Sequence, residues 1–130
     1  MAHIEHIALW TQDIERLVSF YSGYFGATAG PPYTNPAKGF ESRFLRFDNG
    51  ARIELMKTTS LSPTPIAPGE QRMGLTHLAI NVGSKEQVDA LSKRLRTEGY
   101  AIPDGPRRTG DGYYESVVLD PDGNRIEITA

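Results

Sequence analysis

Apolar and polar positions follow two different periods along the chain, and each change of period marks an expected element. Alternation over roughly four to eight residues predicts strands, whereas apolar residues three and four positions apart predict helices. In the first half we expect a strand, a helix and three further strands, at 3–10, 11–27, 27–33, 41–47 and 51–57. The second half is expected to repeat that order, at 75–82, 85–98, 100–103, 113–119 and 124–129. The intervening stretch 58–73 is rich in Pro and Ser, keeps neither period and is interpreted as a linker.

The two halves share sequence as well as the order of their elements. The matching segments are HIALW at 6–10 with HLAIN at 77–81, and RIELM at 52–56 with RIEIT at 125–129. Their offsets are 71 and 73 positions, which is typical of a duplication. We therefore predict an α+β fold of two βαβββ modules, 1–57 and 74–130. Because a module of this size buries too little of its own sheet, the two modules are expected to pair.

Four of the matching residues carry chemistry: His6, Glu54, His77 and Glu127. Alternation along a strand puts all four on the face opposite the aliphatic positions of their strands. Taken singly, a Glu on the polar face of a strand is usually solvated, and a His in an apolar strand is usually a hydrogen-bonded core residue. Their agreement in face and repeat position favours one shared site instead. Two carboxylates on a covered face repel each other unless a cation lies between them, so we predict a metal ion there.

Two imidazoles and two carboxylates form an N2O2 ligand set, which two waters would complete to an octahedron. This set suits Ni, Zn, Co, Mn or Fe(II), and ligand type alone does not choose among them. The chain contains no Cys, which excludes disulfides, thiolate metal sites and a Cys nucleophile.

Charge and hydropathy narrow the expected partners and location. The net charge of −2 and the pI near 5.9 favour neither nucleic acid nor an anionic membrane surface as a partner. No apolar run approaches the roughly 20 residues that cross a bilayer, and no signal-peptide pattern follows Met1. We expect a cytoplasmic protein that acts on a small molecule, without a nucleic-acid or membrane partner.

The segments that carry the repeat resemble a known family. HIALWTQDIERLVSFYSGYFG, RIELM, HLAINV and VVLDPDGNRIEI are similar to segments of the vicinal-oxygen-chelate superfamily, which includes glyoxalase I, bleomycin-resistance proteins and extradiol dioxygenases. The resemblance covers nearly the whole chain apart from the linker. It implies that the two modules form an open, eight-stranded, barrel-like sheet with the helices outside and the metal in its cavity.

The identity of the ligands discriminates within that family. Having Glu54 as well as Glu127 resembles the glyoxalase I pattern, which implies a metal-dependent lyase or isomerase and one Ni or Zn ion. In such a reaction the metal polarises two neighbouring oxygens of a substrate such as a thiol–methylglyoxal hemithioacetal and stabilises its enediolate. The resemblance implies Glu127 as the catalytic base, with Glu54 as the second choice.

Substrate-binding residues depart from the glyoxalase I pattern. Trp10 stands where an Arg that grips glutathione is expected, and Thr58 stands where a glutathione-contacting Asn is expected. Arg107 and Arg108 fall where relatives carry a basic substrate-binding residue, although a solvated loop explains them equally well. Trp10 and Met56 share the face of the four ligands and are predicted pocket walls, with core packing as the alternative.

Two other functions remain open for the sequence. One is an Fe(II) extradiol-type dioxygenase, which would consume oxygen with catechols. The other is a resistance protein that binds a small molecule or antibiotic without reacting with it. A homodimer is expected whether the two halves pair within one chain or with the halves of a partner chain, because open sheet edges need cover. Whether the site forms within one chain or across a dimer is left open.

Overall fold

A computed structural model describes residues 1–62, 64, 67 and 70–130. The chain divides into two compact units, Met1–Thr64 and Pro65–Ala130. Part of the predicted linker, at 63, 65–66 and 68–69, lies outside the described residues. The described residues of each unit form one α-helix and one sheet, and the two units are described separately below.

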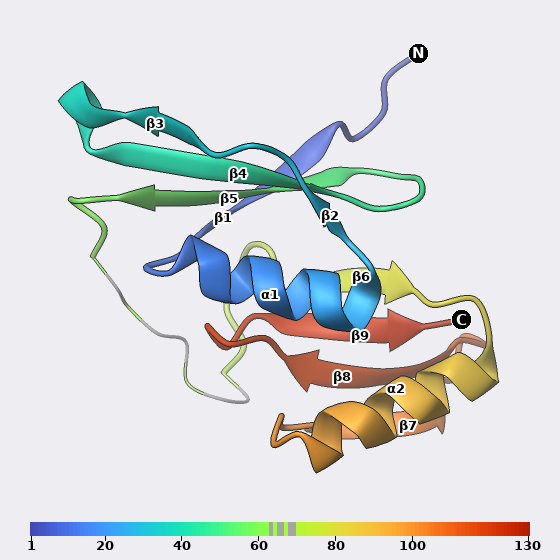
Figure 1. The fold of residues 1–130 in the computed structure, drawn as a ribbon. Helices are drawn as coiled ribbons and strands as arrows, with labels where there is room; N and C mark the ends of the chain where they lie inside the picture. The colour runs from blue at the N-terminus through green and yellow to red at the C-terminus, as the bar shows by residue number, and fades with distance from the viewer. Residues whose placement is uncertain (63, 65–66, 68–69) are drawn as a thin grey trace. The chain divides into compact units, whose positions relative to one another are not determined.

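Unit 1 contains an open sheet in which the first and last strands are neighbours (Figure 1). Its elements are β1 (His6–Trp10), α1 (Ile14–Phe25), β2 (Thr28–Ala29), β3 (Tyr33–Asn35), the 3-10 helix η1 (Pro36–Lys38), β4 (Phe40–Arg46) and β5 (Arg52–Thr58). The strand order is β1-β5-β4-β2, and β3 also pairs with β4. β1 runs parallel to β5, whereas the other pairs are antiparallel.

Unit 2 repeats this arrangement with fewer strands. Its elements are β6 (Leu78–Asn81), α2 (Lys85–Thr97), β7 (Asp104–Arg108), β8 (Tyr114–Leu119) and β9 (Arg125–Thr129). The strand order is β6-β9-β8-β7, with β6 parallel to β9. The predicted α+β class with a βαβββ order in each half is therefore confirmed, and each sheet is open.

Two predicted strands differ from the structure. The strand expected at 27–33 is two short strands, β2 and β3, so the described residues form nine strands rather than eight. The strand expected at 100–103 lies later in the chain, at β7. Gly105 and Pro106 are residue types that are common in turns. Gly105 instead lies within the strand at a φ of 79°, and a Cβ on it would come within 2.5 Å of the Glu115 carbonyl oxygen.

Both α-helices begin after a polar residue whose side chain caps the first turn. The Asp13 side chain accepts a hydrogen bond from the Arg16 amide and begins α1, and Gly26, with a φ of 69°, follows its last turn. The Ser84 hydroxyl accepts a hydrogen bond from the Gln87 amide at the start of α2. These caps satisfy amide groups that have no partner within the helix.

Each helix packs on the aliphatic face of its own sheet. In unit 1, α1 contacts β4 and β5, and the buried side chains include Leu17, Phe20, Tyr21, Leu45, Ile53 and Leu55. In unit 2, α2 contacts β8 and β9, and the buried side chains include Val88, Leu95, Val118, Ile126 and Ile128. The alternation of side chains therefore leaves the opposite face of each sheet, which carries His6 and Glu54 in unit 1 and Glu127 in unit 2, away from the helix.

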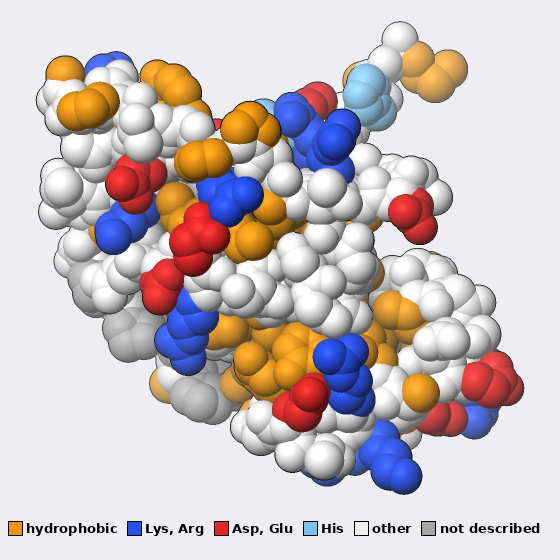
Figure 2. All heavy atoms as spheres, viewed as in Figure 1, with side chains coloured by type: hydrophobic (Ala, Val, Ile, Leu, Met, Phe, Trp, Pro, Cys, Tyr) orange, Lys and Arg blue, Asp and Glu red, His pale blue; other side chains and the backbone are white. Residues whose placement is uncertain are grey.

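On the face shown in Figure 2, acidic and basic side chains are interspersed rather than gathered by sign. None of the helices among the described residues combines the length and the apolar character needed to cross a bilayer.

Candidate functional site

The first His–Glu pair is formed by the parallel strands β1 and β5. In their register Ala8 lies beside Glu54, and His6 lies one pleat earlier on the same face. The His6 Nε2 and Glu54 Oε1 atoms are 3.7 Å apart. The Glu54 side chain is only 18% exposed, so its carboxylate is drawn into the sheet surface rather than free in solvent.

Contacts around His6 orient its ring. Its Nδ1 atom is hydrogen bonded to the Glu5 carboxylate, which also accepts a hydrogen bond from Arg52. The hydrogen bond from His6 is the main cause that holds the pKa of Glu5 below its usual value, so this carboxylate is an acceptor and His6 Nδ1 is the donor. The Phe44 ring meets the imidazole edge to face at 5.3 Å. Together these contacts leave Nε2 as the ring nitrogen that faces Glu54.

Unit 2 reproduces the pair with the same strand geometry. His77 precedes β6 directly, and Ala79 lies beside Glu127 in the parallel register of β6 and β9. The His77 Nε2 and Glu127 Oε1 atoms are 3.3 Å apart, and the Glu127 side chain is 22% exposed. Each unit therefore holds an imidazole and a carboxylate in contact at equivalent positions.

Neither pair alone is a complete metal site. In the part of the chain that the structure describes, no three or more His, Cys, Asp or Glu side chains lie close enough together to hold a metal ion. The prediction that His6, Glu54, His77 and Glu127 share one cation remains a prediction.

Glu115 was missed in the sequence and lies next to Glu127. It is in β8 beside Thr129 of β9, on the face that carries Glu127. The pKa of the Glu115 carboxyl is raised, mainly by burial. The charge of Glu127 and a hydrogen bond with Glu127 raise it further. Alternation along 113–119 could have placed Glu115 on this face. The equivalent residue of the first half is Ser42, so comparison of the two halves did not mark Glu115 as a candidate site residue.

The two predicted basic residues lie on different faces of unit 2. Arg107 pairs with Glu115 in the register of β7 and β8 and lies on the face of Glu127. Its Nε atom donates to Asp104 Oδ1 and its Nη2 atom to Asp104 Oδ2, both at 3.0 Å. Arg108 pairs with Tyr114, on the helix face, with its guanidinium carbon 5.8 Å from the centre of the Tyr114 ring. Of the two, only Arg107 shares a face with the His77–Glu127 pair.

Trp10 and Met56 lie beside each other at the far end of the β1–β5 pair, on the face of His6 and Glu54. The Trp10 ring meets Phe40 edge to face at 6.3 Å, and Phe40 meets Tyr33 at 6.2 Å. We call Trp10, Tyr33, Phe40 and Met56 the aromatic wall. Tyr33 and Phe40 were not identified from the sequence. They come together because β3 pairs with β4, and the segment that joins these strands has no hydrophobic pattern that would predict the pairing.

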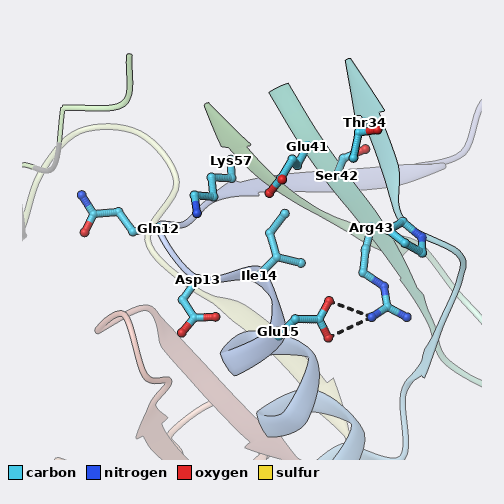
Figure 3. A pocket seen from close by; sticks show the side chains of 10 residues that line it. Gln12, Asp13, Ile14, Glu15, Thr34, Glu41, Ser42, Arg43 and Lys57 are labelled. Atoms are coloured by element: carbon cyan, nitrogen blue, oxygen red, sulfur yellow. Dashed lines mark hydrogen bonds and ion pairs between the residues drawn. The ribbon is translucent and has the colours of Figure 1, made fainter. Parts of the chain in front are cut away.

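A hollow of about 480 Å³ lies on the other side of the unit 1 sheet, at the start of α1 (Figure 3). Its lining includes Glu41, Arg43 and Lys57, which alternate with the residues of the His6–Glu54 face. The Arg43 Nη1 atom donates to both carboxylate oxygens of Glu15, at 2.8 and 2.9 Å. This hollow is thus separate from the His–Glu pair of unit 1.

Comparison with known proteins identifies the family. The model of the Glyoxalase/Bleomycin resistance protein/Dioxygenase superfamily matches residues 3–128. The chain belongs to this superfamily. The resemblance stated from the sequence is confirmed, and the fold agrees with that of superfamily members.

Two curated relatives come from Bacillus subtilis (strain 168). The uncharacterised protein YqjT is 29% identical over 130 residues, which cover 98% of both chains. Catechol-2,3-dioxygenase is 27% identical over 128 residues, which cover 98% of this chain but 41% of the dioxygenase.

Solved structures show the same fold. Glyoxalase I from Zea mays has a TM-score of 0.77 at 22% identity, over 98% of this chain and 44% of the maize chain. A possible glyoxalase from Bacillus cereus has a TM-score of 0.72 at 25% identity, over the full length of both chains. This chain therefore spans less than half of the maize enzyme and of the dioxygenase.

Proposed function

We propose that this protein is a metal-dependent lyase or isomerase of the glyoxalase I type. It would move a proton between two adjacent, oxygen-bearing carbons of a small substrate, such as a thiol–methylglyoxal hemithioacetal. The observation that carries the proposal is the His–Glu pair, which occurs once in each unit with the same strand register. His6, Glu54, His77 and Glu127 would together bind one divalent ion, with Ni or Zn preferred and Co, Mn or Fe as alternatives.

The residues present fit such an ion. Two donors at right angles around a cation, each about 2.1 Å from it, lie about 3 Å apart. The separations of 3.7 and 3.3 Å in the two pairs are slightly longer, so a small approach of each pair would satisfy both donors. A carboxylate that accepts from Nδ1, as Glu5 does for His6, also keeps Nε2 in the form that binds metals.

A bound metal would supply a positive charge beside two neighbouring substrate oxygens, which acidifies the carbon-bound proton between them. Glu127 would accept that proton, the electron pair of the broken C–H bond would form a double bond to the neighbouring carbonyl carbon, and the carbonyl pair would move onto its oxygen. Glu127 would then donate the proton to that neighbouring carbon, and the hydroxyl proton of the first carbon would pass to the oxygen of the second, so that no atom is gained or lost. Glu54 is the second candidate for this role, and the limited exposure of both carboxylates keeps water from competing for the proton.

A dioxygenase is the second candidate, and the similarity to catechol-2,3-dioxygenase favours it. This function needs open positions on Fe(II) for both the catechol and oxygen. A fourth protein ligand, as Glu54 would be, leaves one position fewer than a three-residue set does. For that reason the isomerase is preferred.

The deciding experiment measures bound metal and then activity. We expect about one divalent ion per chain, and turnover of methylglyoxal with glutathione or another thiol after loading with Ni, Zn, Mn or Fe. Oxygen uptake with catechols would favour the dioxygenase, and a protein that takes up no metal would be a binding module.

Glu127→Gln tests the role of the base. Because an amide cannot accept the proton, we expect turnover to fall by at least about a hundredfold. Glu41→Gln is the matched control, since Glu41 is an exposed residue of β4 on the other face of its sheet. Full activity of Glu127→Gln would remove Glu127 from the mechanism.

We also propose that the protein is a cytoplasmic homodimer. Within their own units β1 and β6 are edge strands with one neighbour each, and a second copy is one way to cover such edges.

A further inference from the structure

The unit 1 face changes character along its strands. At one end it carries His6 and Glu54, and at the other it carries the aromatic wall. Met56 follows Glu54 by two residues on the same face, so the Cα atoms of the two residues are about 7 Å apart along the strand. Trp10 and Tyr33 are 50% and 55% exposed, so two large rings are presented rather than buried.

The fold itself does not require these apolar side chains. Unit 2 has the same strand arrangement, and its residues equivalent to Trp10 and Met56 are Asn81 and Thr129. The residue equivalent to Ser42, which is buried between the strands of the wall, is Glu115. Because the positions of Trp10 and Met56 are polar in unit 2, packing of the module does not explain why these two residues are apolar in unit 1, whereas the residue equivalent to Phe40 is Tyr113 and is also aromatic.

The charges near the wall argue against an anionic ligand group. None of its four residues is charged, and neither is the buried Ser42 beside it. Lys57 lies on the opposite face of β5. Arg52, which is on the same face, lies at the other end of the strand beside His6, where it pairs with Glu5 and covers the Phe44 ring at 4.1 Å. A carboxylate held against these four side chains would therefore lose hydration without gaining a cation from the wall itself.

We propose that the aromatic wall binds an uncharged aromatic ring of the substrate, so that among 1,2-dicarbonyl compounds and their thiol adducts the protein prefers an aromatic to a methyl substituent. This inference rests on the function proposed above. The two oxygens would lie at the His–Glu end, and the ring would lie against Trp10, Phe40 and Tyr33. Edge-to-face and stacked contacts with these rings add to the burial of the apolar surface.

Two small chelators distinguish binding of the aromatic ring from binding of the two oxygens. Benzohydroxamate and acetohydroxamate present the same pair of adjacent oxygens but differ in carrying a phenyl or a methyl group. Trp10 is the single Trp of the chain, so its fluorescence reports binding at the wall. With the Ni- or Zn-loaded protein we expect benzohydroxamate to bind about 10- to 50-fold more tightly than acetohydroxamate and to quench Trp10.

Variants assign the preference to the wall, with binding measured by calorimetry. In Trp10→Ala the ratio of the two affinities should fall to within about threefold, and Tyr33→Ala, at a more exposed position, should lower it in the same direction. Tyr24→Ala should leave the ratio unchanged, since Tyr24 is an aromatic residue of α1, which packs on the opposite face of the unit 1 sheet. The ratio of kcat/KM for phenylglyoxal and methylglyoxal with one thiol should change in parallel.

The outcomes are distinguishable. If both hydroxamates bind only with metal but equally well, or if their ratio is the same in Trp10→Ala and Tyr33→Ala, the wall does not select the ring, while the proposed function stands. If Trp10 emission depends on protein concentration and not on either hydroxamate, a second copy of the chain covers the wall and the inference is wrong. If neither hydroxamate binds in a metal-dependent way, the proposed function fails, and the inference fails with it.

Discussion

At the scale of single residues, the candidate site depends on how each imidazole is held. The His6 ring has three neighbours within its own unit: Glu5 at Nδ1, Glu54 at Nε2, and Phe44 against its edge. A carboxylate at Nδ1 raises the basicity of the other nitrogen and stops the ring from turning. Glu5 precedes β1 and has no repeat partner, so the comparison of the two halves could not identify it.

Glu5→Gln should weaken metal binding without removing a ligand. The neutral amide is a poorer acceptor for Nδ1 than a carboxylate, and we expect the Kd for Ni or Zn to rise about tenfold. Competition with a coloured chelator measures this change, with Glu41→Gln as a control of the same chemistry away from the face. An unchanged Kd in Glu5→Gln would mean that Glu5 does not support His6 as a ligand.

At the scale of elements, alternation and repeat position predicted which residues share a face of the sheet. They predicted less well where each strand begins and ends. The faces of the strands that carry Glu54 and Glu127 follow from the aliphatic residues on either side of each glutamate, because those residues must meet the helix. β7 was misplaced because Gly105 and Pro106 are usual turn residues, and only a close approach to β8 explains a glycine there. Pairing between strands, which brings Glu115 to Glu127 and Phe40 to Trp10, depends on loop geometry that no local pattern carries.

The junction of α2 with β8 should make stability depend on pH. The Asp89 carboxylate accepts hydrogen bonds from the Tyr114 hydroxyl and, at 3.0 Å, from Lys85 Nζ. These bonds, that of Tyr114 first, hold the pKa of Asp89 below its usual 3.8. A lowered pKa stabilises the folded state above the pKa of the unfolded chain, and this contribution is lost as the pH falls through the folded-state value.

Between pH 5 and about 2, the Tm of Asp89→Asn should therefore fall less steeply than that of the wild type. Thermal unfolding followed by circular dichroism across this range measures the two slopes. Asp122→Asn serves as the control because Asp122 is an exposed turn residue, and it should keep the wild-type slope. Equal slopes for Asp89→Asn and the wild type would show that the junction does not contribute.

At the scale of the whole molecule, the duplication divides the proposed ligands equally, with two in each unit. If the four ligands share one ion, each chain binds one metal ion. Removing a ligand from either unit should then weaken metal binding equally. At a free concentration of 100 times Kd, metal should stabilise the fold by about 2.7 kcal/mol and raise the Tm by roughly 8–10 °C. Glu54→Gln and Glu127→Gln should each reduce this shift by a similar amount. Two metals per chain, or a shift that only one of the variants reduces, would contradict a shared ion.

Mixing those two variants reveals which units share the ion. If both units of one chain form the site, every chain in a mixture of Glu54→Gln and Glu127→Gln lacks one ligand, and metal affinity stays low. If unit 1 of one chain pairs with unit 2 of a partner, a mixed dimer contains one doubly altered site and one with all four ligands. After unfolding and refolding together, half of the dimers should be mixed, so about a quarter of all sites should recover wild-type affinity. Titration of the refolded mixture against each variant refolded alone decides between the two arrangements, because only the exchanged arrangement produces a tight-binding fraction.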